Sequence, residues 1–260
     1  TGCGRSGDQG AGLSASGSLA TRPLCCSDAR VQPLTQLHDT PDRDGLRLYA
    51  QVPRTRALGP FLRFALWVQG CHLRCPGCMT LEALPFDGGR RVSIESLAAE
   101  ILAVDDIEGL TISGGEPFAQ AAGLAALMGH LRSRRDLGLI LYSGYRLRDL
   151  QRQARRDAGV ARLLAEIDLL IDGPYHAARN DGAPLRGSAN QKVWPLTERY
   201  LPDLQAYGPQ RSREVELHIA IGERMLVGIP SARQLAWWQQ PVAVTQIRAR
   251  PRQNCACTTG

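Results

Sequence analysis

One segment of the sequence, GCHLRCPGC, places three cysteines within a single short loop. Cys71, Cys75 and Cys78 are separated by three residues and then by two, so one loop can present three thiolates. A structural iron–sulfur cluster normally takes four cysteines, and a set of three leaves one iron of a [4Fe–4S] cluster open to a further ligand. The Pro-Gly pair before the last cysteine predicts a tight turn there. The spacing therefore favours a cluster with an open position.

The residues alone leave two other uses of these thiols open. His72 could complete a structural zinc site, although adjacent residues such as Cys71 and His72 rarely point at the same metal. A disulfide between two of the cysteines would leave one thiol over. The remaining cysteines lie towards the two ends of the chain, where we expect free thiols or, as the second interpretation, extra metal ligands: Cys3, Cys25, Cys26, Cys255 and Cys257.

The composition is that of an ordinary globular protein. Of the 260 residues, 43% are hydrophobic and 22% are charged. No run approaches the roughly 18 apolar residues of a membrane span, and no apolar signal segment is apparent, so we expect a cytoplasmic protein without a membrane partner. The net charge of +6 comes from scattered arginines, Lys192 being the only lysine. No basic run interleaved with aromatic residues predicts nucleic-acid binding.

From Leu46 onward, short apolar runs alternate with helical patterns. This alternation predicts parallel βαβ units and an α/β fold, either an open sheet or a partial barrel. Strands are predicted over 46–52, 62–70, 109–113, 137–144 and 168–173, and helices over 93–104 (with Ser93 as N-cap), 118–135, 145–156 and 160–167.

Four glycine-rich or polar segments each follow one of these apolar runs. They are GCHLRCPGC, SGGEP, YSGYR and DGPY. In folds of this class the functional loops gather at the carboxyl ends of the parallel strands. We therefore expect the four segments to share one rim and to form a composite site.

The whole pattern resembles a known family. Its segments occur in the order found in radical S-adenosylmethionine (SAM) enzymes that activate glycyl radical enzymes, and the resemblance covers about residues 46–194. Within that group it is greatest to the activases of anaerobic ribonucleotide reductase. The segments that carry the resemblance are GPFLRFALWVQGCHLRCPGC, TISGGEP, LYSGYRLRDL, IDLLIDGPY and LRGSANQKV.

The resemblance implies a partial (βα) barrel of the radical SAM type, with a mostly parallel sheet, over residues 45–195. Residues 1–44, rich in Gly, Ser, Asp, Arg and Pro, are predicted to be a poorly ordered extension. Residues 196–260 are predicted to form a small α+β appendage, with a hairpin over 214–230 that turns near Gly222, then a helix over 231–240 and a tail.

The resemblance also implies roles for individual residues. Cys71, Cys75 and Cys78 would bind three irons, and the open iron would bind the amino and carboxylate groups of SAM. Gly77 stands where many relatives have an aromatic residue, which leaves adenine stacking to Trp67 or Tyr145. The residues matched to the SAM pocket are Gly114, Gly115 and Glu116 beside the methionyl amino group, with Ser143, Gly144, Asp172 and Ser188 farther along the chain.

Some of these roles have a plainer alternative. Ser143 and Ser188 could be ordinary polar residues of turns. Asp172 could help to hold a monovalent cation near SAM, or it could simply cap the turn that follows its strand.

The function implied is reductive cleavage of SAM to a 5′-deoxyadenosyl radical, which abstracts hydrogen from a glycine of a partner glycyl radical enzyme. The partner would be of the anaerobic ribonucleotide reductase or pyruvate formate-lyase type, with a flavodoxin or ferredoxin type electron donor. No side chain is expected to act as an acid or a base. The alternatives are a radical SAM enzyme that modifies a peptide or small molecule and, more remotely, an iron–sulfur electron carrier or sensor.

Overall fold

The computed structural model describes residues 45–208, 211, 213–220 and 223–238. The predictions for residues 1–44, for the hairpin turn at Gly222 and for the tail after residue 238 lie outside the described residues, as do all five cysteines of the two end segments. The strands are β1 (Leu46–Thr55), β2 (Arg63–Val68), β3 (Arg90–Val92), β4 (Gly109–Gly114), β5 (Gly138–Ser143), β6 (Leu169–Asp172), β7 (Lys192–Pro195), β8 (Val215–Ala220) and β9 (Glu223–Gly228).

The predicted helices are present within a few residues of their expected ends. The α-helices are α1 (Ile94–Leu102), α2 (Ala121–Arg132), α3 (Leu147–Ala154), α4 (Ala158–Glu166), α5 (Leu201–Leu204) and α6 (Ala232–Trp238), and the 3₁₀ turns are η1 (Leu81–Ala83), η2 (Pro117–Gln120), η3 (Ala177–Arg179) and η4 (Gln205–Tyr207). Ser93 caps α1 as predicted, because its hydroxyl accepts the Ser96 N–H at 3.1 Å. The helix expected over 118–135 begins instead as η2 and continues as α2.

A seven-stranded sheet organises the described core, in the order β3-β1-β2-β4-β5-β6-β7. Strands β2, β4, β5 and β6 pair in parallel, as the alternation of strands and helices predicted. The chain enters through β1, which is antiparallel to both β2 and β3, and leaves through β7, which is antiparallel to β6. The fold is therefore mixed α/β with a large, mostly parallel sheet. The short strands β3 and β7 were not predicted, since neither contains an apolar run.

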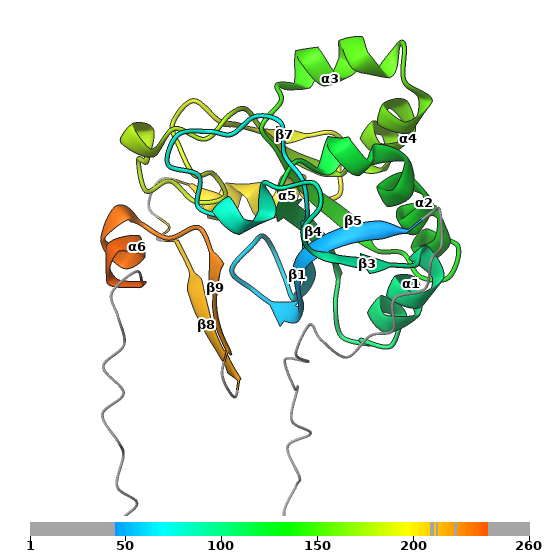
Figure 1. The fold of residues 1–260 in the computed structure, drawn as a ribbon, viewed down its shortest axis with the longest axis horizontal. Helices are drawn as coiled ribbons and strands as arrows, with labels where there is room; N and C mark the ends of the chain where they lie inside the picture. The colour runs from blue at the N-terminus through cyan, green and yellow to red at the C-terminus, as the bar shows by residue number, and fades with distance from the viewer. Residues whose placement is uncertain (1–44, 209–210, 212, 221–222, 239–260) are drawn as a thin grey trace, which may run out of the picture. The chain divides into compact units, whose positions relative to one another are not determined.

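The two faces of the sheet have different partners. Along β2, Phe64, Leu66 and Val68 face the helices, whereas Ala65 and Trp67 face the opposite side. Figure 1 shows α1, α2 and α4 side by side along the helical face. Because β2 is buried on both faces, its sequence reads as a continuous apolar run rather than an alternation.

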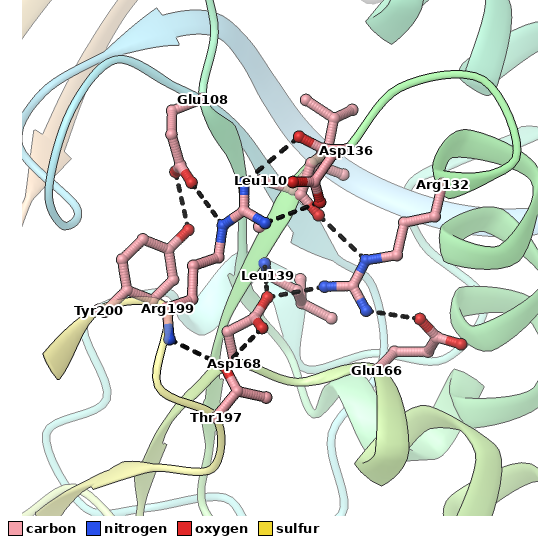
Figure 2. A network of polar contacts seen from close by, with 12 residues as sticks. Glu108, Leu110, Arg132, Asp136, Leu139, Glu166, Asp168, Thr197, Arg199 and Tyr200 are labelled. Carbon is pink, nitrogen blue, oxygen red and sulfur yellow. Dashed lines mark hydrogen bonds and ion pairs between the residues drawn. The ribbon is translucent and has the colours of Figure 1, made fainter.

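Ion pairs stabilise the end of the sheet at which the parallel strands begin, as Figure 2 shows. Glu108, directly before β4, accepts hydrogen bonds from Arg199 Nε and Tyr200 Oη, both at 2.7 Å, and pairs with buried Arg63 at 2.6 Å. Asp168, directly before β6, pairs with Arg132 at 2.7 Å. These charged groups lie at the amino ends of the strands and leave the carboxyl ends free for other chemistry. No helix in the described part of the chain is long and apolar enough to cross a membrane.

Candidate functional site

A cavity of about 470 Å³ lies at the carboxyl ends of the parallel strands. Its volume falls within the roughly 300–1,000 Å³ of small-molecule sites. All four segments expected to share one rim contribute to its wall, so that prediction is confirmed. The contributing residues are Cys71, Leu73, Cys75 and Cys78 of the first segment, Ser113, Gly114, Gly115 and Glu116 of the second, Tyr142, Ser143 and Gly144 of the third, and Gly173 and Tyr175 of the fourth.

Backbone geometry fixes the loop that carries the three thiols. The Cys78 N–H donates to the Cys75 carbonyl at 3.1 Å, and Gly77 has a φ of +74°, which together form a type II turn with Pro76 at its second position. A Cβ atom on Gly77 would also lie 2.9 Å from the Cβ of Ala177. Glycine is therefore required at residue 77 by both the turn and the packing, which explains why no aromatic residue stands there.

Burial and backbone hydrogen bonds act in opposite directions on the charge of two of the thiols. Burial raises the pKa of Cys71, and the backbone N–H groups of Leu73 and Arg74 act in the opposite direction by hydrogen bonding to its sulfur. Burial likewise raises the pKa of Cys78, against a hydrogen bond from the Thr80 N–H. Backbone donors directed at sulfur stabilise negative charge on an iron–sulfur ligand. None of the three cysteines forms a disulfide.

The arrangement does not favour the zinc alternative. The exposed ring of His72 stacks against Phe86, with centroids 4.4 Å apart, and it is not part of the cavity wall. Within the described ranges, no group of three or more His, Cys, Asp and Glu side chains is placed to hold a single metal ion. Zinc needs its ligands to converge on one point. A [4Fe–4S] cluster does not, because each thiolate binds a different iron. The donor set therefore fits a cluster.

The glycine segment after β4 packs directly against the start of the thiol loop. Gly115 N–H donates to the Val68 carbonyl and Glu116 N–H to the Gly70 carbonyl, both at 2.8 Å. A Cβ atom on Gly115 would lie only 2.3 Å from the Gly70 oxygen, so a side chain there would force the two segments apart. This close approach sets the backbone of residues 114–116 beside Cys71.

The carboxylate of Glu116 is buried, with 1% of the residue exposed. One oxygen accepts the Ser143 hydroxyl at 2.9 Å and the Phe118 N–H at 3.0 Å, and the other accepts the Gly144 N–H at 2.9 Å. Burial raises the pKa of Glu116 to about 7, although these three donors favour the ionised form. A cation bound in the cavity would therefore shift this carboxyl readily to its charged state.

Tyr142 supplies a hydrogen-bond donor that no described residue uses. It lines the cavity, and its buried hydroxyl has no hydrogen-bond partner among the described residues. Burial raises the pKa of Tyr142, so the hydroxyl stays protonated. A buried polar group without a partner is costly unless a ligand or water satisfies it, which makes Tyr142 a candidate ligand contact.

Two predicted site residues lie just behind the cavity wall. Asp172 accepts the Leu147 N–H at 2.7 Å and the Lys192 N–H at 3.3 Å, and Ser188 accepts the His176 N–H at 3.1 Å. Neither side chain lines the cavity, whereas the adjacent Gly173 and Gly187 do. Both side chains hold the neighbouring loops in place. Of the two residues expected to stack on adenine, Trp67 lines the cavity and Tyr145 does not.

One wall of the cavity was missed by sequence reasoning. It is built by β9, the residues after it and α6, and the hairpin pattern contains no sign of where the hairpin would pack. Trp238 lies in this wall, with the Arg224 guanidinium 4.6 Å from its ring centroid. The full set is Arg224, Met225, Leu226, Gly228, Ile229, Pro230, Leu235 and Trp238.

Known proteins match the part of the chain that builds the rest of the site. The family of 4Fe–4S single cluster domains matches residues 57–194. A Vibrio cholerae protein named anaerobic ribonucleoside-triphosphate reductase-activating protein is 32% identical over 148 residues, covering 54% of this chain and 91% of the relative. A phage T4 protein with the same name is 27% identical over 145 residues, covering 54% of this chain and 88% of the relative.

A shorter match extends to a second kind of activating enzyme. The pyruvate formate-lyase 1-activating enzyme of Escherichia coli K12 is 35% identical over 68 residues, covering 24% of this chain and 28% of the relative. The family match and these relatives agree with the three-thiol loop and the glycine segment that meet in the cavity. The chain therefore belongs to the 4Fe–4S single cluster domain family, as a radical SAM enzyme of the kind that activates glycyl radical enzymes.

Proposed function

We propose that this protein forms the glycyl radical of a partner enzyme of the anaerobic ribonucleoside-triphosphate reductase type. The observation that carries the proposal is the meeting, in one cavity, of the three thiols with the glycine segment that ends in Glu116. A reduced [4Fe–4S] cluster held by Cys71, Cys75 and Cys78 would supply one electron for the cleavage of SAM to methionine and a 5′-deoxyadenosyl radical, and that radical would take a hydrogen atom from a glycine of the partner.

The protein's own residues would bind the cluster, orient SAM and enclose both within the cavity. Cys71, Cys75 and Cys78 are the proposed ligands of three irons. The backbone of Gly114 and Gly115 offers a close approach for the amino group of SAM, and the Glu116 carboxylate supplies the negative charge that favours an ammonium there. No side chain is assigned a role as general acid or base.

The remaining predicted residues are assigned to positioning. Ser143 and Gly144 hold Glu116 and form the cavity wall beside it. Asp172 and Ser188 are proposed to fix the loops behind the wall, because their side chains already accept backbone N–H groups. A monovalent cation at Asp172 would have to compete with two such hydrogen bonds, so the capping role is the one we propose.

The finer architecture follows the same proposal. Helices on one face of the sheet and a cavity on the other support a partial barrel over residues 45–195, with an extension after residue 195. A small flavodoxin or ferredoxin type protein is the proposed electron donor. The cytoplasm is the proposed compartment, since it keeps free thiols reduced.

The test is an anaerobic reconstitution with iron and sulfide, followed by dithionite and SAM. We expect a cluster and the formation of 5′-deoxyadenosine, measured by chromatography. Cys75→Ala should abolish both, whereas Cys255→Ala, which lies outside the matched residues 57–194, should leave both unchanged. A cluster that forms without SAM cleavage under several reductants would instead identify an electron carrier or sensor, and zinc binding without a cluster would reject the site.

A further inference from the structure

The C-terminal hairpin of β8 and β9 lies outside the family match and packs against the sheet. Val227 and Ile229 are buried together with Val52 and Ala65, on the sheet face opposite the helices. The Glu216 carboxylate accepts the Arg56 N–H at 2.7 Å, which ties β8 to the connection between β1 and β2. The hairpin is therefore a fixed part of the folded core and not a loose addition.

An arginine whose side chain is only 5% exposed, Arg213, fastens the segment that leads into the hairpin. Arg213 donates to the carbonyl oxygens of Ala183 and Arg186, at 2.8 and 2.6 Å, and to Asn180 Oδ1 at 2.6 Å. All three partners belong to the loop between β6 and β7. This loop also contributes Gly187 to the cavity wall. The loop that lines the cavity therefore also holds the start of the hairpin in place.

One face of the hairpin continues the cavity wall outward. The register pairs Leu217 with Leu226 and Ile219 with Arg224, so these four side chains lie on the same face of the two-stranded sheet. Leu226 and Arg224 line the cavity, while Leu217 and Ile219 are 44% and 72% exposed. We call these four residues the hairpin face. Its three apolar side chains form a strip between the cavity wall and the solvent, with Arg224 beside them.

The hairpin face also offers a positive charge. The guanidinium of Arg224 stacks on the Trp238 ring, and in the described part of the chain it forms no ion pair. Leu235 and Trp238 of α6 extend the apolar surface around it. The surface is thus suited to a ligand with apolar groups and a carboxylate.

We propose that the hairpin face binds an extended polypeptide segment of the partner enzyme, on one side of the glycine that enters the cavity. This inference rests on the proposed function and names the surface that recognises its substrate. A glycine within a polypeptide reaches the cavity only if its neighbours along the chain lie outside, where they need a surface to cover them. Leu217 and Ile219 are two residues apart on one strand, about 7 Å, which matches side chains at alternate positions of an extended segment.

A small substrate would make no use of this surface. It would be held entirely within the cavity, and exposed leucine and isoleucine side chains beyond the cavity mouth would then only increase the exposed apolar area. The hairpin face therefore favours a polypeptide substrate over a small molecule.

The experiment compares Leu217→Asp/Ile219→Asp with Leu201→Asp, which changes a leucine of similar exposure (46%) on α5, away from the cavity. The probe is the anaerobic ribonucleoside-triphosphate reductase of the source organism. Its binding to the cluster-free protein is measured by calorimetry, and its glycyl radical is measured by electron paramagnetic resonance with the reconstituted protein. SAM cleavage without the reductase is measured in parallel.

We expect the double variant to weaken binding and lower the radical yield by about tenfold or more, while SAM cleavage without partner is unchanged. Leu201→Asp should behave as wild type. Arg224→Gln should weaken binding severalfold and reduce its dependence on salt, which keeps the test valid if the double variant folds poorly.

The inference is overturned if the hairpin variants bind and activate the reductase as the wild type does. It is also overturned if the wild type cleaves SAM but takes hydrogen from a small molecule and never from the reductase. If binding depends on the hairpin face while no variant, nor the wild type, cleaves SAM, the docking surface stands and the proposed chemistry fails.

Discussion

The hydroxyl of Ser143 donates a 2.9 Å hydrogen bond to the carboxylate of Glu116. Ser143 ends β5 and Glu116 follows β4, so this bond joins two loops that the chain separates by a whole helix. The same hydroxyl accepts the Tyr145 N–H at 3.1 Å. The bond therefore sets the relative position of the two segments, which lie side by side in the cavity wall.

Ser143→Ala removes a donor to a buried carboxylate and an acceptor for a backbone N–H. We expect the free energy of unfolding of the cluster-free protein to fall by about 1–3 kcal/mol, because Glu116 and the Tyr145 N–H both lose a partner. Urea unfolding measures this change. Ser133→Ala, which alters an exposed serine at the end of α2, should cost less than about 0.5 kcal/mol. Equal effects of the two substitutions would show that the bond between the loops does not stabilise the fold.

Glu116 should give the stability of the cluster-free protein a distinct pH dependence. Its pKa is raised from 4.5 to about 7 by burial, so between these values the folded state binds a proton that the unfolded state has released. The stability that this group contributes is present at low pH and is lost as the pH rises through about 7. The thiols of Cys71 and Cys78 titrate above this window, since burial raises their pKa values from 9.0.

The comparison that isolates this effect is Glu116→Gln, which cannot titrate. The difference in unfolding free energy, wild type minus variant, should decrease as the pH rises from about 4.5 to about 7, by up to about 3 kcal/mol. Denaturant unfolding at several pH values measures it. A difference that increases with pH would mean that the folded protein holds Glu116 ionised and that its pKa is lowered.

The ion pair of Arg63 and Glu108, at the amino ends of the parallel strands, should affect the stability of the fold and not SAM cleavage. Glu108→Ala leaves the guanidinium of Arg63, which is fully buried, without its 2.6 Å partner, and also deprives Arg199 and Tyr200 of an acceptor. We expect a loss of about 3–5 kcal/mol in the free energy of unfolding. Where the variant is folded, its SAM cleavage at low temperature should match the wild type.

The control for Glu108→Ala is Asp106→Ala, which breaks the exposed pair of Asp106 with Arg54. Exposed pairs contribute about 0–1 kcal/mol, so thermal unfolding should hardly change. If the two variants lose similar free energies of unfolding, the buried pair does not stabilise the amino ends of the strands as inferred.

Much of the site could be predicted because its signals are local. Cys71, Cys75 and Cys78 stand in one loop, and the turn before Cys78 follows from the Pro-Gly pair. The common rim followed from the alternation of strands and helices, since parallel strands bring their carboxyl ends together. The cavity confirms that the four segments meet.

The parts of the structure that could not be predicted depend on packing between residues far apart in the sequence. The position of the hairpin is set by the burial of Val227 in the same apolar cluster as Ala65, and by the hydrogen bond from Arg213 to the Ala183 carbonyl, whose partners are far apart in the sequence. The edge strands β3 and β7 are short and lack an apolar run, so they are recognisable only once β1 and β6 offer a free edge. Nothing in the hairpin sequence shows that Trp238 lies at the cavity.

Gly77 offers a test of how the thiol loop depends on its turn. Gly77→Ala places a Cβ atom in a left-handed conformation, with φ at +74°, and 2.9 Å from the Ala177 Cβ. Gly182→Ala is a matched control, because Gly182 has a φ of +75° but a Cβ atom added there would meet no described residue beyond its chain neighbours within 4 Å. Both substitutions should cost about 1–2 kcal/mol of unfolding free energy from backbone strain. Only Gly77→Ala should also displace the loop.

We therefore expect Gly77→Ala to bind less iron per protein after reconstitution than Gly182→Ala, even where the two have equal stability. Iron content and the visible absorption of the cluster measure this difference, and urea unfolding of the cluster-free proteins measures the strain that the variants share. A Gly77→Ala protein that is as stable as Gly182→Ala and fills its cluster normally would show that the loop adapts to a side chain. In that case the turn sets the separation of Cys75 and Cys78 less strictly than the 3.1 Å bond between them indicates.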